Sequence, residues 1–304
     1  MLLLAPVVGM SQQTAKLTQY LFNKYALNPA TGGLYGCMEI NLLHRMQWMG
    51  LDGAPRTSML TIHREYGKDQ NFKNSWIGVG VKIERDAVGP FDVIGVSPSF
   101  SYHLKTSKDY TLSFGLFGGI KQHTFKPVDN GLPAADPVFA GNSVSLIWPQ
   151  FTPGIWYNSE RKWFAGLTVD QVWRSKMGSI GSPSKLRPHF YLIAGRKFIR
   201  KGELNAFEPS MMIQYTALWP PSIDWNLKWY YKEAFGVGVG LRTRDGFVAM
   251  IEYQLSKKLR LGYSYDYTTS KVRLSSNNTH EFTLRWVHCV KNEVQPIYYC
   301  PAYK

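Results

Sequence analysis

Apolar and polar residues alternate with a period of two through most of this chain. Between residues 38 and 48, for example, Met38, Ile40 and Leu42 share one face, while Glu39 and Asn41 occupy the other. Successive side chains of a β-strand point to opposite faces, so this pattern predicts a strand with one apolar face. The sequence has no helical period of useful length, and we therefore expect an all-β fold.

The same alternation recurs in fourteen segments, three of them weaker than the rest. An even number of strands, each near the roughly 9 to 11 residues that a tilted strand needs to cross a bilayer, is typical of a membrane barrel. We therefore predict a closed antiparallel transmembrane β-barrel of about 14 strands. The predicted strands cover residues 38–48, 56–65, 77–83, 94–104, 110–120, 151–158, 163–173, 190–198, 204–217, 223–231, 235–241, 247–255, 259–267 and 282–290.

Composition excludes several other classes of protein. Of the 304 residues, 44% are hydrophobic and only 18% charged, which is unlike a disordered chain. The body of the chain has no apolar run near the roughly 18 to 20 residues of a spanning helix. The net charge of +14 includes no block of consecutive basic residues, so a nucleic acid partner is not expected. A soluble β-sandwich or propeller is the alternative fold, disfavoured because no blade repeat is found.

The connections between the predicted strands predict which way the barrel faces. Gaps after even-numbered strands are mostly tight, whereas the long gaps, 122–150, 174–186 and 269–278, follow odd-numbered strands. Membrane barrels have short periplasmic turns, so the tight turns and both termini are expected in the periplasm. Tryptophans near predicted strand ends suit the membrane interface. They are Trp48, Trp76, Trp163, Trp173, Trp225 and Trp286.

We expect four regions along the chain. Residues 1–11 are predicted to be a signal peptide that lacks the usual basic start, and residues 12–36 an N-terminal periplasmic segment. Residues 37–290 would form the outer-membrane barrel, and residues 291–304 a C-terminal periplasmic tail.

The sequence motifs that suggest an enzyme are weak. Gly236, Gly238 and Gly240 alternate with valines inside a predicted strand, so they do not form a dinucleotide-binding loop. His280 and Glu281 begin a zinc-like motif, but Leu follows where the second His is required. We therefore expect no enzyme activity and no catalytic, cofactor or metal site. A hydrolase assembled from separate strands could still use one of the strand histidines, namely His44, His63 or His189.

Seven short runs, spaced along nearly the whole chain, resemble one family in family order. They are QYLFN at 19–23, LNPA at 27–30, RMQWMGLDGAP at 45–55, GLTV at 166–169, EPS at 208–210, GYSYD at 262–266 and THEF at 279–282. Together they resemble the PorP/SprF family, outer-membrane proteins of the Bacteroidetes type IX secretion and gliding machinery.

This resemblance implies a non-enzymatic barrel in the cell outer membrane. Such a barrel would support secretion or surface anchoring of large cargo, such as adhesins with a C-terminal sorting domain. Its implied partners are outer-membrane lipid, secretion-system components and a periplasmic peptidoglycan-binding protein. The alternative is a diffusion porin or channel for small solutes, which would need an open, charge-lined constriction. The long N-terminal segment and tail favour partner binding.

Two segments are candidates for partner contact. The first is a constrained turn that would support either barrel closure or cargo contact, although ordinary turn chemistry explains it equally well. Its residues are Gln47, Trp48, Gly53, Ala54 and Pro55. The second is the apolar, proline-bounded tail, in which Tyr298 and Tyr299 would dock in the lumen mouth or on a periplasmic partner.

Barrel closure also predicts where two cysteines lie. Cys37 starts the first strand and Cys289 ends the last, so closure places them side by side at one rim. A disulfide between them is possible in the oxidising periplasm if their Cα atoms come within about 7 Å. Cys300 could compete for either partner.

Overall fold

A computed structural model describes residues 16–66, 74–126, 143–159, 163–172, 187–199, 204–217, 220–232, 234–243, 245–270, 276 and 278–289. The expected signal peptide and the whole predicted tail, including Tyr298, Tyr299 and Cys300, lie outside these residues, as does Trp173. The elements are η1 Lys24–Ala26, η2 Pro29–Thr31, β1 Met38–Met46, β2 Arg56–Tyr66, β3 Ser75–Val88, β4 Phe91–Ser107, β5 Tyr110–Phe125, β6 Val144–Ser159, β7 Trp163–Asp170, β8 His189–Arg196, β9 Phe198–Ile199, β10 Asn205–Thr216, β11 Ser222–Tyr231, β12 Phe235–Arg242, β13 Gly246–Gln254, β14 Leu259–Thr268 and β15 Thr279–His288.

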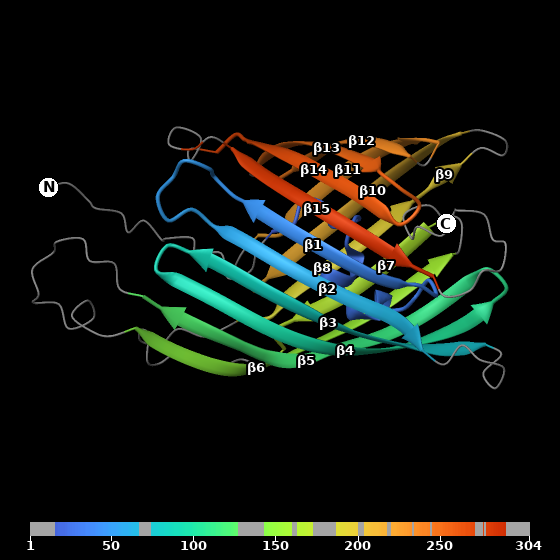
Figure 1. Cartoon of the computed structure of the whole chain (residues 1–304), viewed down its shortest axis with the longest axis horizontal. Coiled ribbons are helices and arrows are strands. Elements are labelled where there is room, and N and C mark those ends of the chain that lie inside the picture. Colours follow the sequence, from blue (N-terminus) through green and yellow to red (C-terminus); the bar gives the residue numbers. More distant parts are fainter. Residues whose placement is uncertain are drawn as a thin grey trace, which may run out of the picture.

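The strands form one closed antiparallel barrel (Figure 1). Each strand pairs with its neighbours along the chain, and β15 pairs with β1, from Met38 opposite His288 to Met46 opposite His280. β8 and β9 both pair with β10 and are parts of one wall strand, interrupted at Lys197. The wall therefore has fourteen strands, and the predicted fold is confirmed.

In the described part of the chain, no helix is both long and apolar enough to cross a membrane.

Side chains are distributed in the opposite way to a soluble β-protein. Outward-facing Leu42 and Phe282 are 46% and 48% exposed, whereas inward-facing Arg45 and Glu281 are 2% and 0% exposed. A soluble sandwich buries its apolar face, so this arrangement excludes the alternative fold. An apolar outer band around a polar interior is what a membrane barrel requires.

Strands β3 to β6 are longer than the sequence predicts. β5, for example, continues to Phe125 rather than residue 120, and β6 begins at Val144 rather than residue 151. The outward residues of these extensions include Gln122, Thr124 and Ser145, which are polar. The apolar alternation therefore ends before the backbone hydrogen bonds between the strands do.

The two ends of the barrel differ. The terminal rim, on the right in Figure 1, carries the start of β1, the end of β15 and the short turns 108–109, 160–162, 232–234 and 255–258. The long-loop rim, at the opposite end, carries the connections 47–55, 126–143, 171–188 and 269–278.

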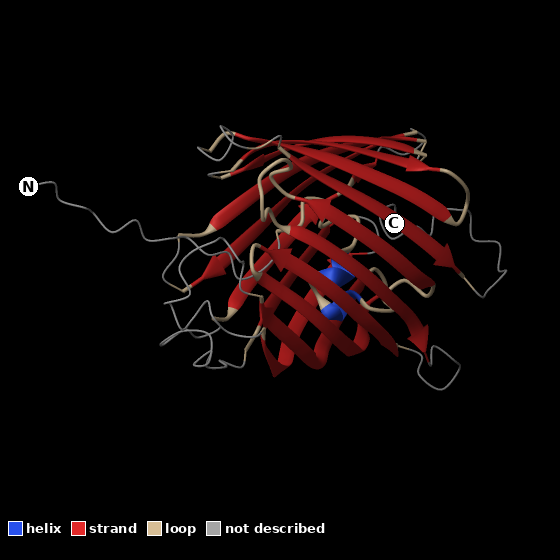
Figure 2. Ribbon diagram, turned by 60° about the vertical axis from the view of Figure 1, so that its left-hand side comes forward, coloured by secondary structure: helices blue, strands red, loops and turns tan. Residues whose placement is uncertain are grey.

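Residues 16–36 lie inside the barrel, and we call them the lumen segment. Figure 2 shows its two helical turns enclosed by the strands. The prediction that residues 12–36 lie in the periplasm is therefore wrong for the described residues of this range. The physical reason is that the segment carries large apolar side chains, such as Tyr20 and Phe22, which the wall buries. Trp76 is likewise not an interface residue, because its buried indole N–H donates to the Gly33 carbonyl oxygen.

Candidate functional site

The lumen segment contacts opposite sides of the wall. The hydroxyl of Tyr20 hydrogen bonds to that of Ser210 on β10 at 2.9 Å. The hydroxyl of Tyr25 hydrogen bonds to that of Ser99 on β4 at 2.6 Å. Between them, the Asn28 side chain donates to the carbonyl oxygens of Ile155 and Leu167, on β6 and β7. The segment therefore bridges the interior of the barrel.

A buried charged cluster fixes the segment near the long-loop rim. The carboxylate of Glu281 accepts the backbone N–H groups of Thr18 and Gln19 at 2.9 and 2.8 Å. Arg45 donates to Glu281 at 3.1 Å, to Asp266 at 2.9 Å and to the Thr18 hydroxyl at 2.7 Å. Hydrogen bonds between charged groups are shorter and stronger than neutral ones, so this end of the segment is held firmly.

Arg242 adds a second cation to this cluster. It donates to Asp224 at 2.9 Å, to Asp266 at 3.3 Å and to the Thr18 hydroxyl at 3.3 Å. Thr18 thus lies between two arginines whose positive charges are paired with carboxylates of the wall. Because the charges are paired with one another, they are not presented to a passing solute.

Near the terminal rim the wall binds the main chain of the segment. The Gly32 carbonyl oxygen lies 2.6 Å from the Ser101 hydroxyl, which donates to it, and 2.8 Å from Nε2 of His103. The N–H of Gly33 donates to Nδ1 of His63 at 3.2 Å. Gly33 has a φ of 68°, a left-handed conformation that favours glycine. These contacts fix the path of the chain toward the first strand.

Several wall glycines leave room for the segment. A Cβ at Gly115 would overlap the backbone of Pro29 and Ala30, and one at Gly78 would overlap the Gly32 carbonyl group. A Cβ at Gly154 would overlap the Asn28 side chain. The wall and the segment are therefore packed against each other as one structure.

A small chamber remains between the segment and strands β2 to β7. Its volume is about 60 Å³, the space of a few water molecules. Lys121 pairs with Glu84 at 2.6 Å, and Asp170 accepts from Thr152 and Gln150 at 2.6 and 2.8 Å. Charged and apolar side chains both line the chamber, and it is too small for a sugar-sized solute.

The predicted turn at 47–55 is held by main-chain hydrogen bonds on the long-loop rim. The Trp48 N–H donates to the Thr279 hydroxyl at 3.1 Å, and the Met49 N–H to the Asn278 carbonyl at 2.8 Å. The turn therefore crosses the seam between β1 and β15. It also binds the turn between β3 and β4, because the Gly89 N–H donates to the Gly53 carbonyl at 2.8 Å.

The base and the tip of this turn differ in exposure. Gln47 is buried, and its N–H donates to the Pro55 carbonyl at 2.9 Å. Ala54 is half-buried, and its N–H donates to the Leu51 carbonyl. At the tip, Met49 and Leu51 are 40% and 37% exposed. The backbone at the base supports the seam, and the apolar tip is available to a partner.

Cys37 and Cys289 meet at the terminal rim, where closure predicts them. Their sulfur atoms are bonded, and their Cα atoms are 4.4 Å apart. The bond joins the end of the last strand to the point where the lumen segment becomes the first strand.

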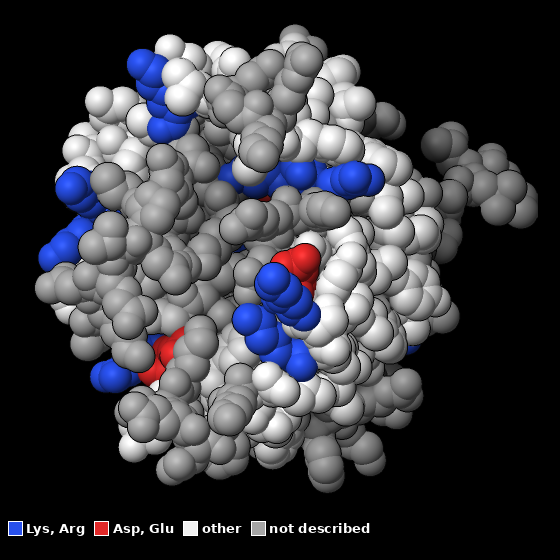
Figure 3. All heavy atoms as spheres, turned by 90° about the vertical axis from the view of Figure 1, so that its right-hand side faces the viewer, with Lys and Arg blue, Asp and Glu red and all other residues white. Residues whose placement is uncertain are grey.

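The terminal rim is basic. Lys and Arg side chains are visible at several separate places on this face in Figure 3. The exposed cations of its strand ends and turns, among the described residues, are Arg64, Lys108, Arg196, Lys232, Lys257 and Lys258. Asp109 is an exposed acidic residue on the same rim.

The strand histidines do not form a hydrolase site in the described structure. His44 hydrogen bonds to Ser58 at 3.0 Å, on the outer wall, but no described carboxylate orients its ring. Nδ1 of His63 accepts a hydrogen bond from the Gly33 N–H, and His189 hydrogen bonds to Thr216 at 2.7 Å. Within the described ranges, no three His, Cys, Asp or Glu side chains converge as metal ligands.

Sequence reasoning missed the lumen segment and the residues that bind it, chiefly Arg45, Arg242 and Glu281. One signal could have found them. Residues 17–35 carry a single charged side chain, Lys24, and many apolar ones, without strand alternation. A solvated linker is more polar than this, so the composition indicates burial.

Comparisons with known proteins agree with the fold. The family model described as type IX secretion system membrane protein PorP/SprF matches residues 9–286. No curated protein sequence gives a significant match.

Solved structures of other barrels are similar in fold. The CymD monoaromatic hydrocarbon channel has a TM-score of 0.52 and 12% identity, over 88% of this chain and 98% of that chain. The toluene transporter TbuX of Ralstonia pickettii has a TM-score of 0.50 and 9% identity, over 86% and 90%. A FadL homologue of Pseudomonas aeruginosa has a TM-score of 0.51 and 11% identity, over 88% and 94%. At such identities the likeness establishes the fold alone.

Proposed function

The chain belongs to the PorP/SprF family of type IX secretion system membrane proteins, and on that premise we propose that it binds protein partners rather than conducting solutes. In this role it is a non-enzymatic barrel of the outer membrane. It supports secretion or surface anchoring of large cargo, such as adhesins with a C-terminal sorting domain.

The observation that carries this proposal is the occupied lumen. The lumen segment bridges the wall from Ser99 to Ser210 through Tyr25 and Tyr20. The glycines of the wall are fitted to it, and the charged groups around it are paired with one another. A diffusion porin instead needs an open, hydrated constriction with charges turned toward the solute.

The two rims suggest where partners bind. The four longest connections between strands lie at one rim, so we assign that rim to the cell surface and the terminal rim to the periplasm. A periplasmic peptidoglycan-binding partner and the secretion components then meet the basic terminal rim. Cargo meets the long-loop rim, where Met49 and Leu51 are exposed.

Affinity purification of the tagged barrel in mild detergent tests the proposal. We expect the wild type to recover a secretion component or a surface adhesin. The double variant Met49→Ser, Leu51→Ser should recover less cargo, whereas Leu204→Ser should recover as much cargo as the wild type. Leu204 is a matched control because it is also an exposed leucine but belongs to the terminal rim.

Two outcomes would contradict the proposal. One is recovery of neither class of partner from a folded, heat-modifiable barrel. The other is a large, steady conductance of the purified wild type in a planar bilayer, which would favour the diffusion channel instead.

A further inference from the structure

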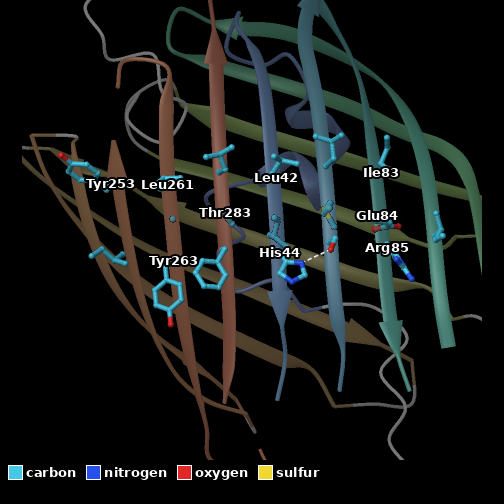
Figure 4. A pocket seen from close by; sticks show the side chains of 18 residues that line it. Leu42, His44, Ile83, Glu84, Arg85, Tyr253, Leu261, Tyr263 and Thr283 are labelled. Atoms are coloured by element: carbon cyan, nitrogen blue, oxygen red, sulfur yellow. Dashed lines mark hydrogen bonds between the residues drawn. The ribbon is translucent and has the colours of Figure 1, made fainter. Parts of the chain in front are cut away.

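The outer wall carries an apolar groove near the seam between β1 and β15. The groove has a volume of about 730 Å³ and extends from β13 to β4, which is within the range of small-molecule sites, about 300–1,000 Å³. Figure 4 shows Leu261, Leu42 and Ile83 along it, on β14, β1 and β3. The groove faces away from the lumen, so its occupant comes from the membrane.

Strand register arranges the floor of this groove into a row of aliphatic side chains. Each member faces the next across a strand pair, and all of them point outward. The members that line the groove are Leu261, Leu284, Leu42, Leu60 and Ile83, and the row continues beyond it as Val96 and Ile120. Such a row has the character of the hydrocarbon-facing band of a barrel.

A second row follows two residues further toward the long-loop rim, about 7 Å along each strand. Here Tyr263, Phe282, His44, Ser58 and Arg85 face one another in the same order. His44 and Ser58 are hydrogen bonded at 3.0 Å, as Figure 4 shows. The outward side chains thus change from aliphatic groups to groups that include hydrogen-bonding ones within two residues along the strands.

The outer wall beside the polar end of the groove has a net positive charge. Arg85 and Lys126 both bind the one carboxylate of Asp92, at 2.9 and 3.2 Å. Their side chains are 60% and 61% exposed, so one positive charge in excess faces the membrane interface. Guanidinium and ammonium groups at this depth are typical binding partners of lipid phosphates.

We propose that this groove binds one lipid with a net negative phosphate head group, from the membrane leaflet on the long-loop side. Its acyl chains lie along the leucine row, and its phosphate lies beside Arg85 and Lys126. His44 and Ser58 hydrogen bond to the head group. A protein partner is disfavoured because the site changes from hydrocarbon to cation over about 7 Å, which is the profile of an amphiphile.

A second groove on the same wall provides a control. It has a volume of about 1010 Å³ between β7 and β14 and is also apolar, but its cation is Arg196, near the terminal rim. If the lipid binds beside Arg85, removing the charge of Arg196 should not change lipid retention. A nonspecific effect of losing a surface arginine would instead lower retention in both variants.

The test is lipid retention by the full-length barrel, measured by native mass spectrometry in lipid-free detergent. The purified protein is mixed with diphosphoryl lipid A or, separately, with dioleoylphosphatidylcholine. We expect the wild type to retain one lipid A per barrel. The double variant Arg85→Gln, Lys126→Gln should bind it at least tenfold more weakly, and Arg196→Gln should bind it as wild type does.

A third variant separates the groove from simple charge attraction. Ile83→Trp fills the groove and leaves both cations in place, so it should also reduce lipid A retention by at least tenfold. Heat-modifiable migration on gels verifies that each variant is folded. The proposal is overturned if the wild type prefers phosphatidylcholine or retains neither lipid. Unchanged retention in either the double variant or Ile83→Trp also overturns it.

Discussion

The carboxylate of Glu281 accepts the backbone N–H of Thr18 at 2.9 Å, although 263 positions separate the two residues. The last strand therefore binds the lumen segment directly. Because Arg45 of the first strand donates to the same carboxylate, the cluster also joins the two strands that close the barrel.

Glu281→Gln should lower the free energy of unfolding by about 3 kcal/mol, because it breaks a buried ion pair and leaves Arg45 to share Asp266 with Arg242. Denaturant unfolding of the refolded barrel in lipid vesicles measures this. Asp109→Asn is the control, since Asp109 lies in an exposed turn. Equal stability of the two variants would show that the cluster does not hold the segment.

Gly115→Ala should destabilise the barrel by about 1–3 kcal/mol, the usual cost of overpacking. The new methyl group would overlap the backbone of Pro29 and Ala30. Gly118→Ala on the same strand is the matched control, because its nearest neighbour would be a Phe151 ring carbon at 3.9 Å. Comparable unfolding midpoints for both variants would argue against a filled lumen.

Thr279→Val should cost about 1 kcal/mol of stability, because the backbone N–H of Trp48 loses its acceptor. Trp48→Ala keeps that bond and should leave barrel assembly unchanged on heat-modifiability gels. Surface labelling of cargo in the Trp48→Ala strain then tests whether the indole contacts cargo. Normal cargo display would restrict the turn to a structural role.

The unfolded, unreduced chain should contain one reactive thiol, because one bond joins two of its three cysteines. Thiol titration in denaturant measures this number. Cys37→Ser in a Cys300→Ser background should lower stability by about 2–4 kcal/mol. Failure of a short thiol reagent to join Cys37 to Cys289 in reduced, folded Cys300→Ser protein would contradict the register.

Deleting residues 291–304 should leave a heat-modifiable barrel and weaken recovery of periplasmic partners. The tail includes Tyr298 and Tyr299 in an apolar, proline-bounded stretch, whereas an unbound exported tail is more often polar. A version in which both tyrosines are changed to serine separates side-chain binding from tail length. Full partner recovery by both versions would remove the tail from the binding surface.

The strands of the wall could be predicted from the sequence because the wall separates lipid on its outer face from a polar interior. Hydrocarbon outside and polar groups inside require alternation, so segments such as 259–267 and 282–290 are visible without homologues. Closure then follows from strand number, and the neighbouring positions of Cys37 and Cys289 follow from closure. The extensions of β3 to β6 were missed because polar outward residues such as Gln122, Thr124 and Ser145 interrupt the apolar alternation, while the backbone pairing continues.

The interior could not be predicted in the same way. Charged residues such as Arg45, Arg242 and Glu281 are usual on the polar inner face of a barrel, so the sequence does not distinguish them. Their contacts with the lumen segment join residues that are far apart in the sequence. The lumen segment has no regular period, because its residues contact wall strands on several sides of the barrel. Of the candidate site, the turn near Trp48 could be located from its Gly and Pro residues, but its hydrogen bond to Thr279 depends on barrel closure.

The fit between the lumen segment and the wall makes the two surfaces depend on each other. Tyr20 and Tyr25 reach opposite sides of the barrel, and Asn28 occupies the space left by Gly154. The interior of the wall is therefore complete only with the segment in place. The Cys37–Cys289 bond fixes the point where the segment becomes the first strand to the end of the last strand, so one covalent anchor holds both the segment and the seam.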